Sequence, residues 1–231
     1  MISENLENIR RRIAQACSRA GRDPHTVSLV AVTKTFVADA VREAVGAGVL
    51  DIGENYVQEL LAKRDQIRNE NVRWHFIGHL QTNKVKFIAD WIAMVHAVDS
   101  PGLVAALDRR AATSGRVLPC LVEVNTTGEQ SKFGLASGAV TGFIRSLAGY
   151  THVRIAGLMT IGPFLPDPEG SRPMFVRLRE LRDEIVALRQ PNATMEHLSM
   201  GMSGDFEVAI EEGATLIRLG TAIFGPRVRK T

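Results

Sequence analysis

The chain has 231 residues, of which 45% are hydrophobic and 23% are charged, and its formal net charge at pH 7 is +3. These values are typical of an ordinary globular protein and exclude a disordered chain and a membrane protein. The basic residues are dispersed and only 6% of residues are aromatic, so we expect no nucleic-acid partner.

The N-terminal segment alternates charged and apolar residues and has no hydrophobic signal-peptide region. No apolar run approaches the roughly 20 residues that a membrane-spanning helix needs, so we expect no membrane partner. The only two cysteines, Cys17 and Cys120, lie far apart and have no metal-ligand partner at short spacing. We therefore expect free thiols and a cytoplasmic protein.

The first segments predict a helix, a buried strand and a second helix. Residues 3–20 place apolar side chains at helical spacing, and Gly21 ends that helix. Residues 28–36 carry a nearly continuous apolar run that delivers Lys34, which is typical of a strand covered on both faces. Lys34 could simply mark the strand end in water, as most lysines do. Alternatively, desolvation at the mouth of a strand would lower the pKa of its amine and let it attack a carbonyl.

Helix and strand patterns then alternate along the rest of the chain. The predicted helices cover 38–45, 54–67, 82–89, a segment that begins at Ser100-Pro101, 137–148, 172–189, 205–212 and a short stretch after Gly220. The predicted strands cover 51–53, 73–77, 92–98, 117–124, 153–158, 194–198 and 215–219.

Together with the Lys34 strand, this makes about eight strands separated by helices, as a barrel of this type requires. We predict that residues 1–231 form a single domain, a closed (β/α)8 barrel of the TIM type with an extra N-terminal helix. The alternative is an open flavodoxin-like or Rossmann sheet, but no G-x-G-x-x-G follows the first strand.

In such a barrel the site lies where the C-terminal ends of the strands converge. Seven residues are expected there, namely Lys34, Asn55, His79, Asn125, Met159, Ser199 and Arg218. The polar segment 125–134 is longer than its neighbours, and it is either a wall of the site or a plain connection.

Two late segments are candidates for binding a phosphate. Residues 199–205 include Ser203 and Gly204 and lead into a helix, and Gly220-Thr221 opens the terminal helix. Backbone N–H groups at helix N-termini favour anions, and the loops after strands seven and eight often hold phosphate in these barrels. Either segment alone could be only a turn or a cap. Their occurrence on adjacent strands favours the phosphate site.

Arg218 lies in an otherwise apolar strand, where a charge needs a partner. It either forms a structural ion pair with Glu123 or Glu196 or donates to the ring or phosphate of a ligand. His75 and His79 have an i, i+4 spacing, but they fall on a strand and a loop and lack a completing ligand, so we expect no metal. Of the two, His79 is the candidate at the barrel mouth.

A reactive lysine, a phosphate cradle and an arginine together indicate a ligand with an aldehyde at one end and a phosphate at the other. Pyridoxal phosphate fits this description. A phosphosugar that passes through a Schiff base, as in a lysine-dependent aldolase, fits almost as well.

Six ordered motifs resemble the pyridoxal phosphate homeostasis protein family, which is similar to the N-terminal barrel of alanine racemase, fold type III. They are VAVTK (30–34), GENYVQE (53–59), WHFIGHLQTNK (74–84), GLMTI (157–161), LSMGMS (198–203) and RLGTAIFG (218–225). The resemblance implies that Lys34 forms the internal aldimine and that Arg218 faces the pyridine nitrogen. It implies a phosphate site at Ser203, Gly204, Gly220 and Thr221, and it places Asn55, Met159 and Ser199 near the cofactor, with His79 at the mouth.

The same resemblance implies storage or delivery of the cofactor, possible exchange with apo-enzymes that use it, and no robust turnover. An arginine at the pyridine nitrogen makes the ring a poorer electron sink than a carboxylate would. We also expect a monomer without the second domain that gives racemases their catalytic tyrosine. The alternatives are a minimal amino-acid racemase and a lysine Schiff-base aldolase.

Overall fold

The structure, a computed structural model, describes residues 1–127, 133–163 and 165–226. Its barrel strands are β1 (Ser28–Val32), β2 (Asp51–Glu54), β3 (Arg73–Phe76), β4 (Met94–Val98), β5 (Leu118–Asn125), β7 (Val153–Met159), β8 (Ala193–Ser199) and β9 (Leu216–Leu219). Its α-helices are α1 (Ile2–Arg19), α2 (Ala38–Gly46), α3 (Val57–Ile67), α4 (Pro101–Thr113), α5 (Ser137–Ser146), α6 (Arg172–Ala187), α7 (Phe206–Glu211) and α8 (Thr221–Phe224).

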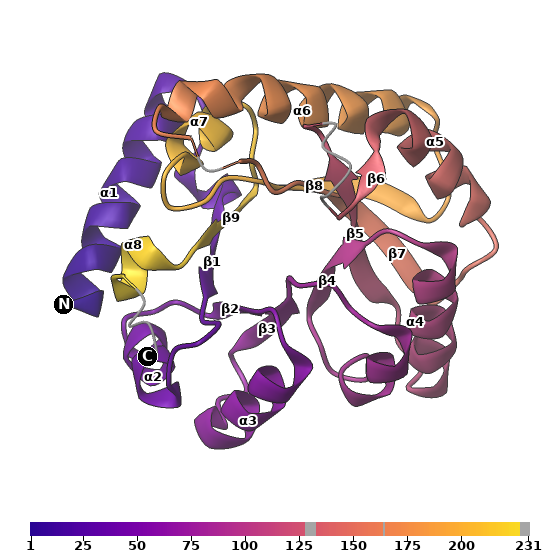
Figure 1. The fold of residues 1–231 in the computed structure, drawn as a ribbon, viewed down its shortest axis with the longest axis horizontal. Coiled ribbons are helices and arrows are strands. Elements are labelled where there is room, and N and C mark those ends of the chain that lie inside the picture. The colour runs from indigo at the N-terminus through magenta and orange to yellow at the C-terminus, as the bar shows by residue number, and fades with distance from the viewer. Residues whose placement is uncertain (128–132, 164, 227–231) are drawn as a thin grey trace.

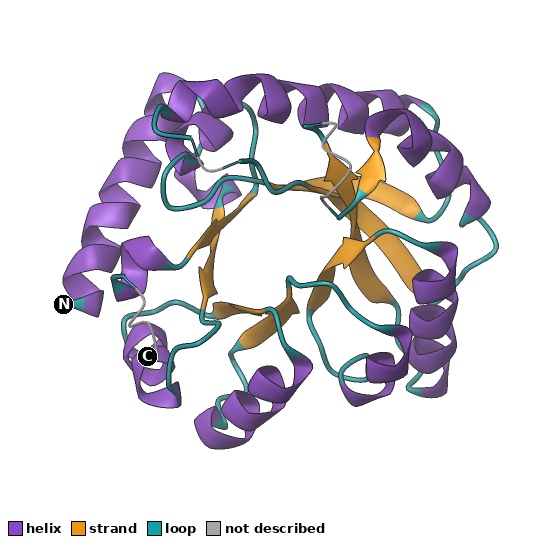
Figure 2. Cartoon of the chain, in the orientation of Figure 1, coloured by secondary structure: helices purple, strands orange, loops and turns teal. Residues whose placement is uncertain are grey.

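The eight parallel strands form a closed ring with the helices outside it (Figures 1 and 2). Around the ring the order is β4-β3-β2-β1-β9-β8-β7-β5, and pairing between β4 and β5 closes it. The predicted (β/α)8 barrel is therefore confirmed. All eight strands run the same way, so their C-terminal ends meet at one mouth.

Local structure differs from the sequence prediction in three places. Residues 82–89 were predicted to be a helix, and the structure has a shorter 3-10 helix over Thr82–Phe87. A two-residue strand, β6 (Leu135–Ala136), pairs with β5 outside the ring. Strand β1 ends at Val32, so Lys34 lies in the turn beyond the strand. Residues 128–132 of the long polar segment 125–134, which was predicted as a wall of the site or a plain connection, lie outside the described residues.

The predicted N-terminal helix is α1, which packs beside α7 and α8. Its apolar stripe is buried, and polar contacts near its start and at its middle also tie the helix in place. Asn5 Nδ2 donates to the Ile223 carbonyl at 2.9 Å, and Arg12 Nε pairs with Glu207 at 2.6 Å. The helix therefore braces the two short helices that follow β8 and β9.

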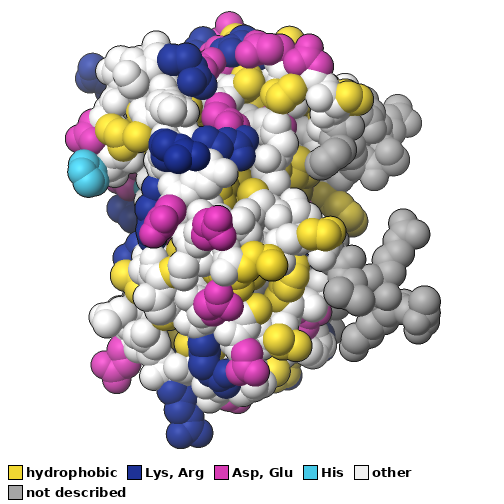
Figure 3. All heavy atoms as spheres, turned by 90° about the vertical axis from the view of Figure 1, so that its left-hand side faces the viewer, with side chains coloured by type: hydrophobic (Ala, Val, Ile, Leu, Met, Phe, Trp, Pro, Cys, Tyr) yellow, Lys and Arg dark blue, Asp and Glu magenta, His cyan; other side chains and the backbone are white. Residues whose placement is uncertain are grey.

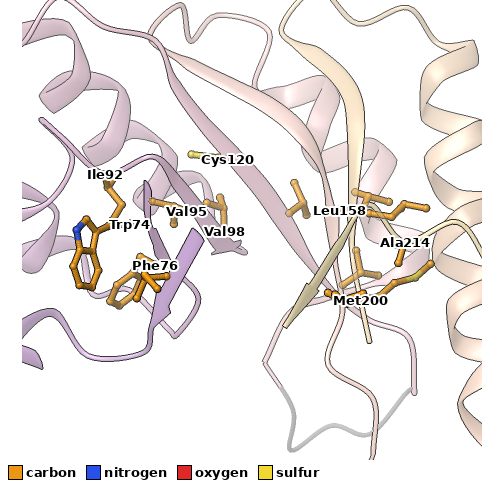
Figure 4. Packing of buried hydrophobic residues seen from close by; sticks show 14 of the residues in the cluster. Trp74, Phe76, Ile92, Val95, Val98, Cys120, Leu158, Met200 and Ala214 are labelled. Carbon is orange, nitrogen blue, oxygen red and sulfur yellow. The ribbon is translucent and has the colours of Figure 1, made fainter. Parts of the chain in front are cut away.

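Two apolar layers stabilise the barrel. The larger one lies between the strands and the surrounding helices, and Figure 4 shows parts of it beside β3 and β4 and beside β7. The smaller one fills the inside of the ring and consists of Val30, Met94, Ala97, Leu121, Ala156, Met159 and Leu216. Strands that are apolar on both faces follow from this arrangement.

None of the described helices is long and apolar enough to cross a membrane. Figure 3 shows the face that carries α1, where Lys and Arg side chains are mixed with Asp and Glu. Two of these pairs are Arg12–Glu207 and Arg19–Glu211. On this face, basic charge is not gathered into the continuous patch that nucleic-acid binding needs.

Candidate functional site

A cavity of about 230 Å³ lies at the C-terminal ends of β1, β2 and β9. Six of the predicted site residues line it: Lys34, Asn55, Ser203, Arg218, Gly220 and Thr221. The four other lining residues are Val32, Ile77, Ile161 and Met202, which sequence reasoning did not single out. A cavity of this size, apolar with a few polar groups, suits a ligand of one ring and short substituents.

The five remaining predicted residues do not line this cavity. Asn125 is the last residue of β5, and its Oδ1 accepts from the Thr127 N–H at 3.2 Å. Ser199 is fully buried behind Arg218, and Met159 belongs to the apolar layer inside the ring. Gly204 lies in the loop next to Ser203. His79 is exposed, stacks on Phe133 with ring centroids 4.8 Å apart, and has its Nδ1 3.8 Å from Asp99.

The turn that carries Lys34 has a strained backbone. Thr35 has φ of +70°, which is uncommon for a β-branched residue. Its N–H donates to Glu59 Oε2 at 2.9 Å, so α3 holds the turn in this conformation. Thr35 lies directly beside Lys34, and the surrounding contacts must hold it in this strained conformation.

A buried charge cluster supports the same turn. The Lys63 ammonium donates to the Thr33 carbonyl at 2.6 Å, to Glu54 Oε1 at 2.5 Å and to Glu59 Oε2 at 3.2 Å. The Glu54 side chain is fully buried, and its Oε1 also accepts a hydrogen bond from the Thr33 hydroxyl. Burial raises the pKa of Glu54 above its usual value, although Lys63 and Thr33 oppose this change. The lysine of this cluster lies two turns into α3 and was not predicted to matter.

The loops after β8 and β9 are joined by backbone contacts. The Arg218 N–H donates to the Gly201 carbonyl at 3.0 Å, and the Ala222 N–H donates to Ser203 Oγ at 3.1 Å. Gly201 has φ of +90°, and a Cβ there would lie 2.6 Å from the Ala209 Cβ. Asp205 fixes the loop by accepting from the Met202 N–H at 2.7 Å.

This pair of loops leaves backbone donors available. Within the described residues, the N–H groups of Ser203, Gly204 and Thr221 make no hydrogen bond. Ser203 and Gly204 precede α7, and Thr221 is the first residue of α8, so these unpaired amides lie where anions are attracted. The arrangement can therefore cradle a phosphate between the two loops.

Arg218 extends from β9 to the cavity and is 5% exposed. Its Nη1 donates to Ser199 Oγ at 2.6 Å, and its Nη2 donates to the Thr160 carbonyl at 2.8 Å. Burial lowers the pKa of Arg218 to about 10, so the guanidinium is still charged at neutral pH. Among the described residues it forms no ion pair within 4 Å, in contrast to the expected partners Glu123 and Glu196. The Ser199 hydroxyl and the Thr160 carbonyl hold the guanidinium instead.

The residues present fit pyridoxal phosphate. The cavity combines an amine, a buried cation and two loops with free amides, and Asn55 contributes a buried Oδ1 that has no partner in the described part of the chain. An acceptor left unpaired next to a cavity is costly without a ligand. In the same described residues, no group of three or more His, Cys, Asp or Glu side chains is arranged to hold a metal ion.

Comparison with known proteins gives a consistent result. The family model "Alanine racemase, N-terminal domain" matches residues 5–228. A protein of Aquifex aeolicus named "Pyridoxal phosphate homeostasis protein" is 43% identical over 224 residues, which cover 97% of each chain. Among solved structures, an unknown protein from Bifidobacterium adolescentis has a TM-score of 0.91 at 36% identity, covering 96% of this chain and 94% of the other.

A further solved structure includes a ligand. PipY of Synechococcus elongatus, described as having PLP bound, has a TM-score of 0.84 and 33% identity, covering 97% of this chain and all of its own. The matches extend over nearly the full length of the chain, so they span the residues that line the cavity.

Proposed function

The chain belongs to the pyridoxal phosphate homeostasis protein family, and we propose on that premise that it binds pyridoxal 5′-phosphate in the described cavity and stores or delivers it. The observation that supports this most directly is the cavity itself, which brings Lys34, Arg218 and the free amides of two loops together. We propose that residues 1–231 act as one cofactor-binding domain.

Each part of the cavity has a distinct role in this proposal. Bound pyridoxal phosphate supplies an aldehyde carbon that an amine can attack with loss of water, giving a reversible C=N bond. Lys34 provides the amine. The amides of Ser203, Gly204 and Thr221 receive the phosphate, since they are the free donors of the two loops. Arg218, which lines the cavity, would be the donor for the ring nitrogen and, because a guanidinium only donates, would keep that nitrogen as an acceptor without a proton.

A reversible bond and an unprotonated ring nitrogen favour holding the cofactor over using it. Asn55 adds an acceptor beside the ring, while Val32, Ile77 and Ile161 exclude water from its edges. We propose that exchange occurs with apo-enzymes that require the cofactor and that the protein acts as a monomer. The buried free thiols of Cys17 and Cys120 support a cytoplasmic location.

Titration with pyridoxal phosphate tests the binding proposal. The wild type should develop the visible absorbance of a C=N bond, and borohydride should trap one cofactor per chain on Lys34. The Lys34→Ala variant should lose this absorbance, whereas Lys86→Ala, which alters an exposed lysine, should keep it. A wild type that takes up no cofactor would refute the proposal.

A transfer assay tests storage and delivery. Loaded protein is mixed with an apo-enzyme that needs pyridoxal phosphate, and recovery of that enzyme's activity is compared with free cofactor at the same concentration. We expect recovery from the loaded wild type. Steady turnover of an amino acid or a phosphosugar that depends on Lys34 would instead favour a racemase or an aldolase.

A further inference from the structure

A line of buried polar side chains crosses the inside of the barrel. Arg218 Nη1 lies 2.6 Å from Ser199 Oγ, and that oxygen lies 3.0 Å from His96 Nδ1. His96 Nε2 lies 2.9 Å from His75 Nδ1, and His75 Nε2 lies 2.9 Å from Asp51 Oδ1. The line thus begins at the cavity on β9, passes through β8, β4 and β3, and ends at the first residue of β2.

The far end of this line is at the opposite side of the barrel. Asp51 begins β2, so it lies at the N-terminal ends of the strands, away from the mouth. There Arg73, whose side chain is 57% exposed, donates from Nε and Nη2 to both carboxylate oxygens at 2.6 Å. Burial acts to raise the pKa of Asp51, but hydrogen bonds from His75 and Arg73 outweigh it and hold the pKa below its usual value. Asp51 is therefore an anion.

Donor and acceptor capacities fix where the protons are. A guanidinium only donates, so Ser199 Oγ accepts from Arg218; a carboxylate only accepts, so His75 Nε2 carries the proton directed at Asp51. Burial, with charge repulsion from His75, holds the pKa of His96 well below its usual value, so this ring is neutral.

The Ser199 hydroxyl accepts from Arg218, so its own proton needs an acceptor, and His96 Nδ1 lies within reach. When His96 Nδ1 accepts, the proton of this ring is on Nε2, which donates to His75 Nδ1. This arrangement gives each of the five residues a hydrogen-bond partner. Every donor points from the cation Arg218 toward the anion Asp51. Hydrogen bonds aligned in this way polarise one another in a medium of low dielectric constant.

We propose that Asp51, His75 and His96, none of which lines the cavity, are positioning residues that hold the Arg218 guanidinium in place for the cofactor ring. The inference rests on the proposed binding of pyridoxal phosphate. Through Ser199, the polarised line fixes one edge of the guanidinium and draws its donors toward the anion. The remaining N–H donors of Arg218 are left for the ring nitrogen. Asp51, at the far side of the barrel, influences how strongly they donate.

The surroundings argue against a role in packing alone. His96 is fully buried and His75 is 4% exposed, and the neighbouring interior positions are apolar, among them Met94 and Ala97 on the same strand as His96. Burying two imidazoles costs free energy unless each nitrogen is paired, and apolar residues would fill this space without that cost. Every ring nitrogen of this line has a partner, and the line ends on Arg218 in the cavity. The function of the line is therefore to act on Arg218.

The first test reads the protons directly. The full chain is labelled with 15N-histidine, and the six histidines are observed by NMR before and after addition of pyridoxal phosphate, with His75→Gln and His96→Gln used for assignment. We expect Nε2 of both rings to donate and Nδ1 of both rings to accept. A proton on Nδ1 of either ring would overturn the directional line whether or not the cofactor binds.

The second test reads the cofactor. His96→Phe interrupts the line and should raise the dissociation constant for pyridoxal phosphate about tenfold and shift the absorption maximum of the bound cofactor. His96→Gln should restore the wild-type spectrum, since its amide oxygen can accept from Ser199 and its amide nitrogen can donate to His75. Met94→Leu, a change on the same strand and inside the same ring, should leave both measurements at wild-type values.

A variant at the far end guards against misfolding of His96→Phe. Asp51→Asn keeps an acceptor for His75 but removes the anion, and it should shift the bound-cofactor spectrum in the same direction with an affinity loss of a few fold at most. If both variants match Met94→Leu in spectrum and affinity while the wild type binds the cofactor, the positioning role is wrong. A wild type that binds no pyridoxal phosphate refutes the proposed function itself.

Discussion

The two walls of the cavity are held in place by different forces. The amine wall, defined here as residues 33–35, 54–59 and 63, rests on a buried charge cluster around Lys63. The phosphate wall, residues 199–205 and 218–222, rests on backbone hydrogen bonds, a glycine and the Asp205 carboxylate. Loss of a charge in the amine wall should therefore lower stability. In the phosphate wall, the gain of a single methyl group should have that effect.

The largest expected effect is the loss of charge from the amine wall. Lys63→Met leaves the buried Glu54 carboxylate without its cation and should lower the free energy of unfolding by about 4 kcal/mol. Urea denaturation measures this. Lys86→Met, an exposed lysine, should change it by less than about 0.5 kcal/mol. Adding Glu54→Gln to Lys63→Met should recover part of the loss, and no recovery would mean that the charge pair is not the cause.

The second prediction concerns Glu123, a buried carboxyl near Arg218 of the phosphate wall, whose contribution to stability should depend on pH. Burial raises the pKa of Glu123 to about 7, with Asp99 adding to the effect and Arg218 opposing it. The native state therefore holds this proton more tightly than the unfolded state, so the stability from Glu123 is present below about pH 4.5 and is lost as the pH rises through 7.

Glu123→Gln removes this dependence. Between about pH 5 and about pH 8 the variant should gain about 3 kcal/mol relative to the wild type, as read from denaturation curves at each pH. Glu196→Gln changes a half-exposed carboxylate on β8 and should show a flat difference over the same range. A flat result for Glu123→Gln would show that the carboxyl is solvated in the native state.

A smaller effect should come from adding one methyl group to the phosphate wall. Gly201→Ala places a Cβ against Ala209 at a backbone angle that favours glycine, and it should cost about 2 kcal/mol of unfolding free energy. Gly204→Ala, in the same loop but with open space around it, should cost less than about 0.5 kcal/mol. Equal losses in the two variants would contradict the steric account of this wall.

The smallest effect should be a gain in stability. Thr35→Gly relieves the left-handed strain of the Lys34 turn and should stabilise the protein by about 0.5 kcal/mol, since part of the relief is offset by entropy of the unfolded chain. Thermal denaturation can measure this. We expect weaker cofactor binding in the same variant, because a loosened turn no longer fixes the amine. Tighter binding would show that the strain opposes the ligand.

Patterns local in the sequence were sufficient for most of the fold. The alternation of apolar strands with helices predicted the eight-stranded barrel, and the apolar run before Lys34 predicted a lysine near a strand end. The two loops predicted to bind phosphate do meet at the cavity, where Ser203, Gly220 and Thr221 line it, but their role stays a prediction. The segment 82–89 was predicted to be a helix without a type, since its spacing does not distinguish a 3-10 helix from an α-helix, and the structure has a 3-10 helix over Thr82–Phe87.

Contacts across the barrel could not be found in this way. His75 was weighed as a metal ligand from its spacing to His79, whereas its actual partners are His96 and Asp51 on neighbouring strands. The register between strands and the curvature of the ring decide which side chains meet, and neither is written in local spacing. Lys63 was missed for a similar reason, because one lysine on an amphipathic helix has no mark of burial.

The packing of α1 against α7 and α8 sets an order of assembly. The amine wall is built from contacts within residues 33–63, while the phosphate wall runs into α8, whose Ile223 carbonyl accepts from Asn5, 218 positions away. Distant contacts form slowly, and a chain leaving the ribosome has its N-terminal part first. The nascent protein can therefore settle its lysine turn early, whereas the phosphate cradle is completed only when the last segment returns to the first helix. The proposed site is in this way complete only in finished molecules.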